Sequence, residues 1–78
     1  MMYELMIRFK IISLDRIIET RLDTRLSFKA NFCYLHDLID IDLEDVKIYD
    51  PNKNIFLDEN VEISKYNIAY YITLHLFT

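Results

Sequence analysis

Alternation of side chains at the amino-terminal end is the feature that most constrains this chain. Residues 3–12 place two sets on opposite sides: Tyr3, Leu5, Ile7, Phe9 and Ile11 against Glu4, Met6, Arg8, Lys10 and Ile12. A period of two residues is typical of a β-strand that buries one face. We therefore expect a sheet whose apolar side is covered by another element.

The same period returns after a short turn. Residues 13–16 form the predicted turn, and in residues 16–23 Ile18, Thr20 and Leu22 alternate with Ile17, Glu19 and Arg21. These patterns predict an antiparallel hairpin at the start of the chain.

The period then changes to that of a helix. Phe28, Phe32, Leu35 and Ile39 recur at intervals of four, three and four residues. This apolar stripe predicts a helix over residues 28–40, packed on the sheet, with Ser27 as its N-cap. The acidic residues of segment 37–45 oppose the helix dipole at a carboxyl end, so the helix is expected to unwind there.

The second half of the chain reads as three further strands. Val46 and Ile48, the turn at 50–54 and the apolar residues 55–57 predict a second hairpin, which a compact connection over 61–68 joins to a last strand at 71–77. We expect this last strand to lie beside the first, in parallel, because burying Leu74 and Leu76 centrally removes the most apolar surface from water. The predicted fold class is α+β, a single domain over 1–78 with a mixed sheet in ββαβββ order and one helix across one face.

Composition excludes several classes of function. The 78 residues include nine basic and thirteen acidic side chains, a net charge of −4 that would repel nucleic acid. The absence of Gly removes phosphate-binding and dinucleotide-binding loops, and Cys33, the single cysteine, precludes an internal disulfide. No apolar run is long enough for direct membrane insertion, and residues 1–10 lack a signal-peptide pattern, so a cytoplasmic location is expected.

Three sets of residues are candidates for a site. Cys33 and His36 could share a metal, or the His36 imidazole could act as a base that activates the Cys33 thiol. A buried structural cysteine is, however, the commoner arrangement. The acids of 37–45 lack the Gly and the spacing of a calcium loop, which favours a solvated loop or contact with a partner. Tyr66 is expected to anchor its connection through its ring and hydroxyl. We therefore expect no catalytic residue, no metal and no cofactor.

A partner-binding site is expected on the exposed face of the sheet. If Leu74 and Leu76 point to the helix, the residues that alternate with them and their neighbours on the first strand point away. The candidate partner-binding residues are Phe77, His75, Met6, Arg8 and Lys10. An apolar residue rimmed by polar ones on an open sheet suits a docking surface, although isolated apolar side chains are also ordinary on surfaces.

The segment "ISKYNIAYYITLHLF", residues 63–77, resembles the carboxyl-terminal part of ubiquitin. The matching residues are Ser64, Tyr66, Asn67, Ile68, Thr73, Leu74, His75 and Leu76. A second resemblance covers more of the chain. The segments "LSFKANFCYLHDLIDI", residues 26–41, and "FLDENVEISKYNIAYYITLHLF", residues 56–77, resemble the bacterial ubiquitin-like proteins of the YukD and EsaB type.

This resemblance implies a β-grasp fold and a role in the type VII (WXG100, Ess-type) secretion systems of Gram-positive bacteria. It implies a cytoplasmic accessory or regulatory subunit that binds proteins on the sheet face that ubiquitin uses, and no enzymatic activity. Because the sequence ends in Leu76, Phe77 and Thr78 without the Gly-Gly of conjugated relatives, conjugation is not expected. The alternatives are a stand-alone ubiquitin-like adaptor, or a module that dimerises through a sheet edge.

Overall fold

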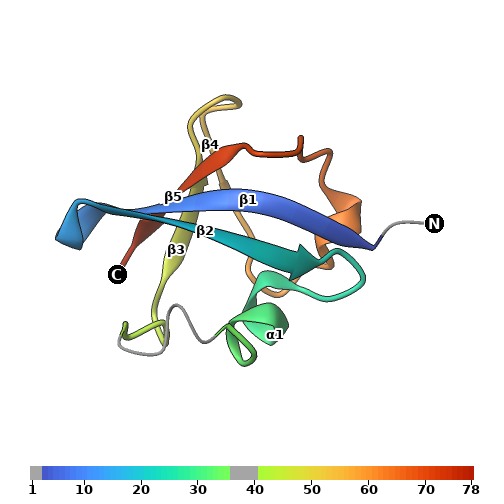
Figure 1. Ribbon diagram of the computed structural model, residues 1–78, viewed down its shortest axis with the longest axis horizontal. Helices are drawn as coiled ribbons and strands as arrows, with labels where there is room; N and C mark the ends of the chain where they lie inside the picture. Colours follow the sequence, from blue (N-terminus) through green and yellow to red (C-terminus); the bar gives the residue numbers. More distant parts are fainter. Residues whose placement is uncertain (1–2, 36–40) are drawn as a thin grey trace.

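Five strands in the order β2-β1-β5-β3-β4 form one mixed sheet in the computed structural model, which describes residues 3–35 and 41–78 (Figure 1). The strands are β1 (Glu4–Ile11), β2 (Arg16–Asp23), β3 (Lys47–Asp50), β4 (Ile55–Leu57) and β5 (Thr73–Phe77). One α-helix, α1 (Phe28–Phe32), and two short 3-10 helices, at Ile12–Leu14 and Ile63–Lys65, complete the described elements. The predicted α+β class and the order of elements are confirmed.

The last strand lies in the middle of the sheet, as predicted. β5 pairs in parallel with β1, from Arg8 opposite Thr73 to Ile11 opposite Leu76, and antiparallel with β3 on its other side. Leu74 and Leu76 are fully buried. The carboxyl-terminal strand thus joins the two hairpins, β1-β2 and β3-β4, into one sheet.

The core lies between the inner face of the sheet and α1. The inward residues of β1 are Leu5, Ile7, Phe9 and Ile11, all buried. Phe9 meets both helix rings edge-on, with centroids 6.3 Å from Phe28 and 5.7 Å from Phe32. Such edge contacts add to the apolar burial that holds the helix on the sheet.

The helix is shorter than the predicted span of 28–40. Ser27 is its N-cap, as predicted, because its Oγ accepts a 3.1 Å hydrogen bond from the Ala30 amide. The helix ends at Phe32, however, with Cys33 as C-cap, while Leu35 still packs against the core from irregular backbone. The apolar spacing correctly identified Phe28, Phe32 and Leu35 as positions that pack in the core, but packing at Leu35 does not require helical backbone. Residues 36–40 of the predicted helix lie outside the described residues.

Asn31 fastens α1 to the end of β2. Its Oδ1 accepts a 2.8 Å bond from the Asp23 amide, and its Nδ2 donates 3.0 and 2.8 Å bonds to the carbonyls of Asp23 and Ser27. The Asn31 side chain therefore bonds to both the N–H and the C=O group of Asp23, as the backbone of a neighbouring strand would. Burial of Asn31 is possible because its polar atoms are all bonded.

Left-handed backbone is adopted without glycine. Asp15 has φ 47° and Asn54 has φ 56°, and both residue types tolerate this region in turns. Tyr71 has φ 60°, an uncommon value for an aromatic residue, and its amide donates to the Met6 carbonyl at 2.7 Å. Because of this turn, the last strand begins at Thr73 rather than at the predicted residue 71.

Candidate functional site

The five predicted partner-binding residues lie on one face of the sheet, opposite the core and α1. Met6, Arg8 and Lys10 alternate with the buried residues of β1, and His75 and Phe77 alternate with Leu74 and Leu76. Lys10 is directly opposite His75 in the β1-β5 pairing. We call this side of the sheet the outer face. The arrangement follows from the two-residue period of neighbouring strands in register.

Four rings on this face form one connected group, the aromatic cluster, which consists of Tyr49, Phe56, His75 and Phe77. Tyr49 lies at its centre, with ring centroids 5.0 Å from Phe56, 6.1 Å from His75 and 6.3 Å from Phe77. Phe56 and Phe77 are 6.1 Å apart. Three strands, β3, β4 and β5, therefore contribute to a single aromatic surface.

The cluster is open to solvent at its edges. Phe56 is 60% exposed and Phe77 is 39% exposed, while Tyr49 and His75 are half-buried. The Tyr49 hydroxyl bonds to the side-chain carbonyl of Asn54 in the β3-β4 turn, which fixes the ring. Two large apolar rings thus stand exposed on an ordered base.

Tyr49 and Phe56 were missing from the sequence prediction. Tyr49 could have been found, because Lys47 and Tyr49 alternate with Ile48 and Asp50 along β3. Phe56 stands between two other apolar residues, so no local period separates its face from theirs. Its outward direction follows only from its pairing with Tyr49.

Basic side chains border the aromatic cluster. Lys10 lies beside His75, and Lys47 is opposite Phe77 in the β3-β5 pairing. Both belong to the outer face, in a chain with a net charge of −4. A locally basic rim on an acidic protein favours approach of a negatively charged partner segment.

The Arg8 side chain is fixed by contacts within the domain. Its guanidinium lies 3.5 Å from the Glu19 carboxylate, donates to the Tyr71 carbonyl at 3.1 Å and stands 5.5 Å from the Tyr71 ring centre. These contacts hold the left-handed Tyr71 turn against β1. Of the five predicted residues, Arg8 therefore has the clearest structural role.

The other candidate residues lie in different parts of the structure. Cys33 is exposed, so the expectation of a buried cysteine is wrong; it is the C-cap at which the helix ends. His36 lies outside the described residues. Tyr66 packs against the core and its hydroxyl accepts a 2.8 Å bond from the Asp58 amide, which confirms the structural role.

The acidic segment 37–45 is described only in part. Residues 37–40 lie outside the described residues, and Asp42, Glu44 and Asp45 are exposed. Among residues 3–35 and 41–78, no group of three potential ligands is placed to hold a metal ion. Within the same ranges, no helix is both long and apolar enough to cross a membrane.

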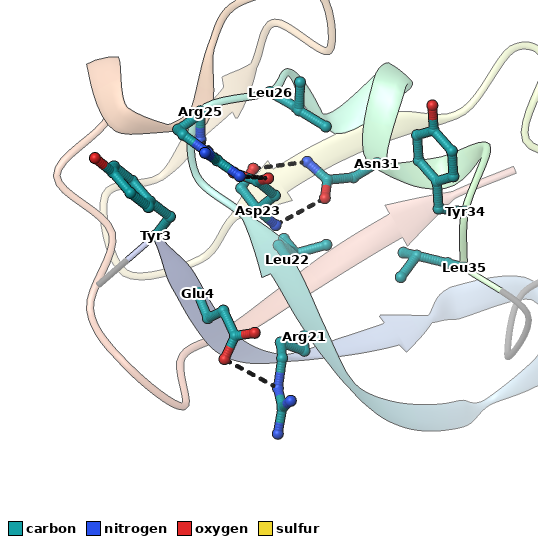
Figure 2. A pocket seen from close by; sticks show the side chains of 10 residues that line it. All are labelled: Tyr3, Glu4, Arg21, Leu22, Asp23, Arg25, Leu26, Asn31, Tyr34 and Leu35. Atoms are coloured by element: carbon teal, nitrogen blue, oxygen red, sulfur yellow. Dashed lines mark hydrogen bonds and ion pairs between the residues drawn. The ribbon is translucent and has the colours of Figure 1, made fainter. Parts of the chain in front are cut away.

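A second surface feature is the hollow between β2, α1 and the start of β1 (Figure 2). Its charged side chains pair with one another, Arg21 with Glu4 at 3.7 Å and Arg25 with Asp23 at 2.8 Å. Hydrogen bonds from the Arg25 side chain and amide lower the pKa of Asp23. Because each of these charges has a partner and Asn31 is bonded to backbone, the described residues that line the hollow offer no unpaired charge to a charged ligand.

Comparison with known proteins gave no family model that matches the chain and no curated sequence with significant similarity. The aromatic cluster is therefore the candidate site on structural grounds alone.

Proposed function

We propose that this chain is a ubiquitin-like β-grasp domain that acts by binding a partner protein on its outer face. The resemblance in residues 26–41 and 56–77 suggests the partner's setting, which is a cytoplasmic subunit complex of a type VII secretion system. Two observations agree with a β-grasp: the order of the elements, and the parallel pairing of the first and last strands in the middle of the sheet.

The aromatic cluster carries this proposal. Phe56 is 60% and Phe77 39% exposed, so the uncovered parts of these rings contribute little to folding. A partner that covers them would remove this apolar surface from water. Aromatic side chains are enriched at interface centres because they bury a large area while few rotatable bonds are fixed. Here Tyr49 is already fixed through Asn54, so less entropy is lost on binding.

The rim of the cluster indicates the chemistry of the partner. Lys10 and Lys47 flank the rings on the same face. A segment with apolar side chains at its centre and Asp or Glu at its ends would satisfy both the rings and the lysines. We infer that the partner presents such a segment.

The proposal is tested by affinity capture from the native host with wild-type protein and two variants. Phe77→Glu places a carboxylate among the rings of the aromatic cluster, and we expect it to abolish capture of secretion-system subunits. Tyr34→Glu is the matched control, because Tyr34 is 72% exposed but borders the hollow beside α1 rather than the outer face. Both variants should keep the wild-type circular dichroism spectrum.

Three outcomes would count against the proposal. If Phe77→Glu captures the same proteins as the wild type, binding does not use the outer face. If Phe77→Glu unfolds, Phe77 belongs to the core. If the captured partners depend on Phe77 but have no connection to secretion, the domain is a stand-alone adaptor.

A further inference from the structure

One margin of the sheet ends in a long strand. β2 has eight residues and pairs with β1 on one side, whereas the opposite margin is the three-residue strand β4. No strand among residues 3–35 and 41–78 pairs with the other side of β2. Figure 1 shows β2 at this margin, with α1 near its carboxyl end. An exposed strand of this length is a template for pairing with another chain.

The pairing of β2 with β1 identifies which residues of β2 point their backbone N–H and C=O groups away from the sheet. The Thr24 amide donates to the Tyr3 carbonyl at 2.7 Å, in continuation of the β1-β2 register. Because antiparallel partners alternate, even-numbered residues of β2 bond to β1 and odd-numbered residues point their N–H and C=O groups away. Asp23 confirms the phase, since both of its backbone groups bond to Asn31 outside the sheet.

Asn31 therefore sets the end of the usable edge. The outward groups of Asp23 are occupied, and the next outward residues toward the amino end are Arg21, Glu19 and Ile17. Their side chains share the outer face, and Ile17 is 60% exposed. The edge is thus a short segment with one negative and one positive side chain two residues apart.

We propose that this edge pairs with the same edge of a second copy of the chain, antiparallel, with the two-fold axis at Thr20. Glu19 then lies opposite Arg21 of the other copy, and Arg21 opposite Glu19, so both cross-strand pairs are attractive. An axis at Glu19 would oppose two carboxylates directly, which disfavours it. In the proposed register the outward groups of Glu19 and Arg21 bond across the axis, and Asn31 of each copy prevents further pairing.

Both charged residues retain open sides for this contact. Glu19 pairs with Arg8 at 3.5 Å but its side chain is 49% exposed, and Arg21 pairs with Glu4 at 3.7 Å with a side chain 64% exposed. The axis is perpendicular to the sheet, so the two outer faces lie on the same side of the joined sheet. The contact is small, and a dissociation constant on the order of 100 μM is expected for so limited an interface.

Charge exchange tests this register. Glu19→Arg puts two like charges opposite each other at both cross-strand positions, and Arg21→Glu does the same with the opposite sign. Each variant alone should dimerise about tenfold more weakly than the wild type, because two attractive pairs become repulsive. An equimolar mixture of the two variants should dimerise at least as well as the wild type, since every cross-strand pair is again attractive.

Sedimentation velocity over a concentration series measures these constants. The control mixture combines Arg21→Glu with Glu44→Arg, which has the same net charge as Glu19→Arg but keeps the wild-type edge. Its mixed pairs have one attractive and one repulsive position, so this mixture should form no more dimer than its two components measured separately. Amide exchange of Glu19 and Arg21 should slow with concentration, whereas Thr20, already bonded to β1, should not change. Far-UV circular dichroism checks that each variant folds.

The proposal is overturned if the wild type remains monomeric at about 1 mM, ten times the expected constant. It is also overturned if the dimer forms but neither single charge reversal weakens it, or if the complementary mixture is no stronger than the control mixture. These measurements use the purified domain alone, so their outcome is independent of the capture experiment on the outer face.

Discussion

Replacing Asn31 by Asp tests how the helix is fastened to the sheet with the smallest possible change. The two side chains have nearly the same shape, and the bond from the Asp23 amide to Oδ1 is kept. The two bonds that Nδ2 donates to the carbonyls of Asp23 and Ser27, at 3.0 and 2.8 Å, are lost. A carboxylate oxygen then faces two carbonyl oxygens in a position where Asn31 is only 5% exposed.

The expected loss of stability follows from these contacts. Each lost hydrogen bond contributes about 1 kcal/mol net, which gives about 2 kcal/mol before the cost of burying the charge. The unpaired carboxylate adds further cost, so the total loss should be about 3 kcal/mol. A domain of 78 residues is stable by only about 4–12 kcal/mol. Asn31→Asp should therefore remove a large share of the folding free energy.

The loss should also depend on pH in one direction. Burial and the two facing carbonyls raise the pKa of the introduced carboxyl in the folded state, so the folded protein binds more protons than the unfolded chain. The variant should therefore approach the wild type as the pH falls toward about 4, where a protonated carboxyl can donate one of the lost bonds.

Urea denaturation near neutral pH and near pH 4, followed by circular dichroism, measures both effects. Asn67→Asp is the matched control, because Asn67 is exposed and should lose less than about 0.5 kcal/mol. The role assigned to Asn31 would be refuted if Asn31→Asp lowered the free energy of unfolding as little as the control does. It would also be refuted if the difference from the wild type did not become smaller at acid pH.

Four other substitutions have defined outcomes. Leu74→Ala should cost about 3–5 kcal/mol, because Leu74 is fully buried in the central strand, whereas Phe77→Ala in the same strand should cost under about 1 kcal/mol in chemical denaturation. Asp15→Gly should raise the melting temperature by a few degrees, since glycine adopts φ 47° at less cost than even an aspartate, which tolerates it; a lower melting temperature would contradict this. The lowered pKa of Asp23 means that its contribution is complete above the ordinary value of 3.8 and is lost as the pH falls below it. Arg25→Gln should accordingly lose less stability than the wild type between about pH 5 and pH 2, and an equal loss would exclude the ion pair as the cause.

Local periodicity was sufficient for the strands that alternate. In β1 and β5 every second side chain is buried, and this pattern alone placed His75 and Phe77 opposite Leu74 and Leu76. The central position of β5 also followed from the sequence, because few other arrangements bury Leu74 and Leu76. Ser27 was identifiable as a cap because capping depends only on residues within one helical turn.

Other features depend on residues that are distant in the chain. Phe56 belongs to the aromatic cluster because β4 pairs with β3, and the run of apolar residues around it does not encode that direction. The helix ends at Phe32 although the apolar spacing continues, since Leu35 reaches the core without helical backbone. Asn31 terminates the β2 edge through bonds to Asp23, eight residues earlier.

The amino-acid sequence by itself therefore determined the faces of the strands, because the direction of a side chain on a strand is a property of local backbone geometry. Only the tertiary structure decided which exposed side chains meet and which backbone groups stay open. Those contacts join segments that no local pattern relates, and they exist only after the strands have paired and the helix has docked.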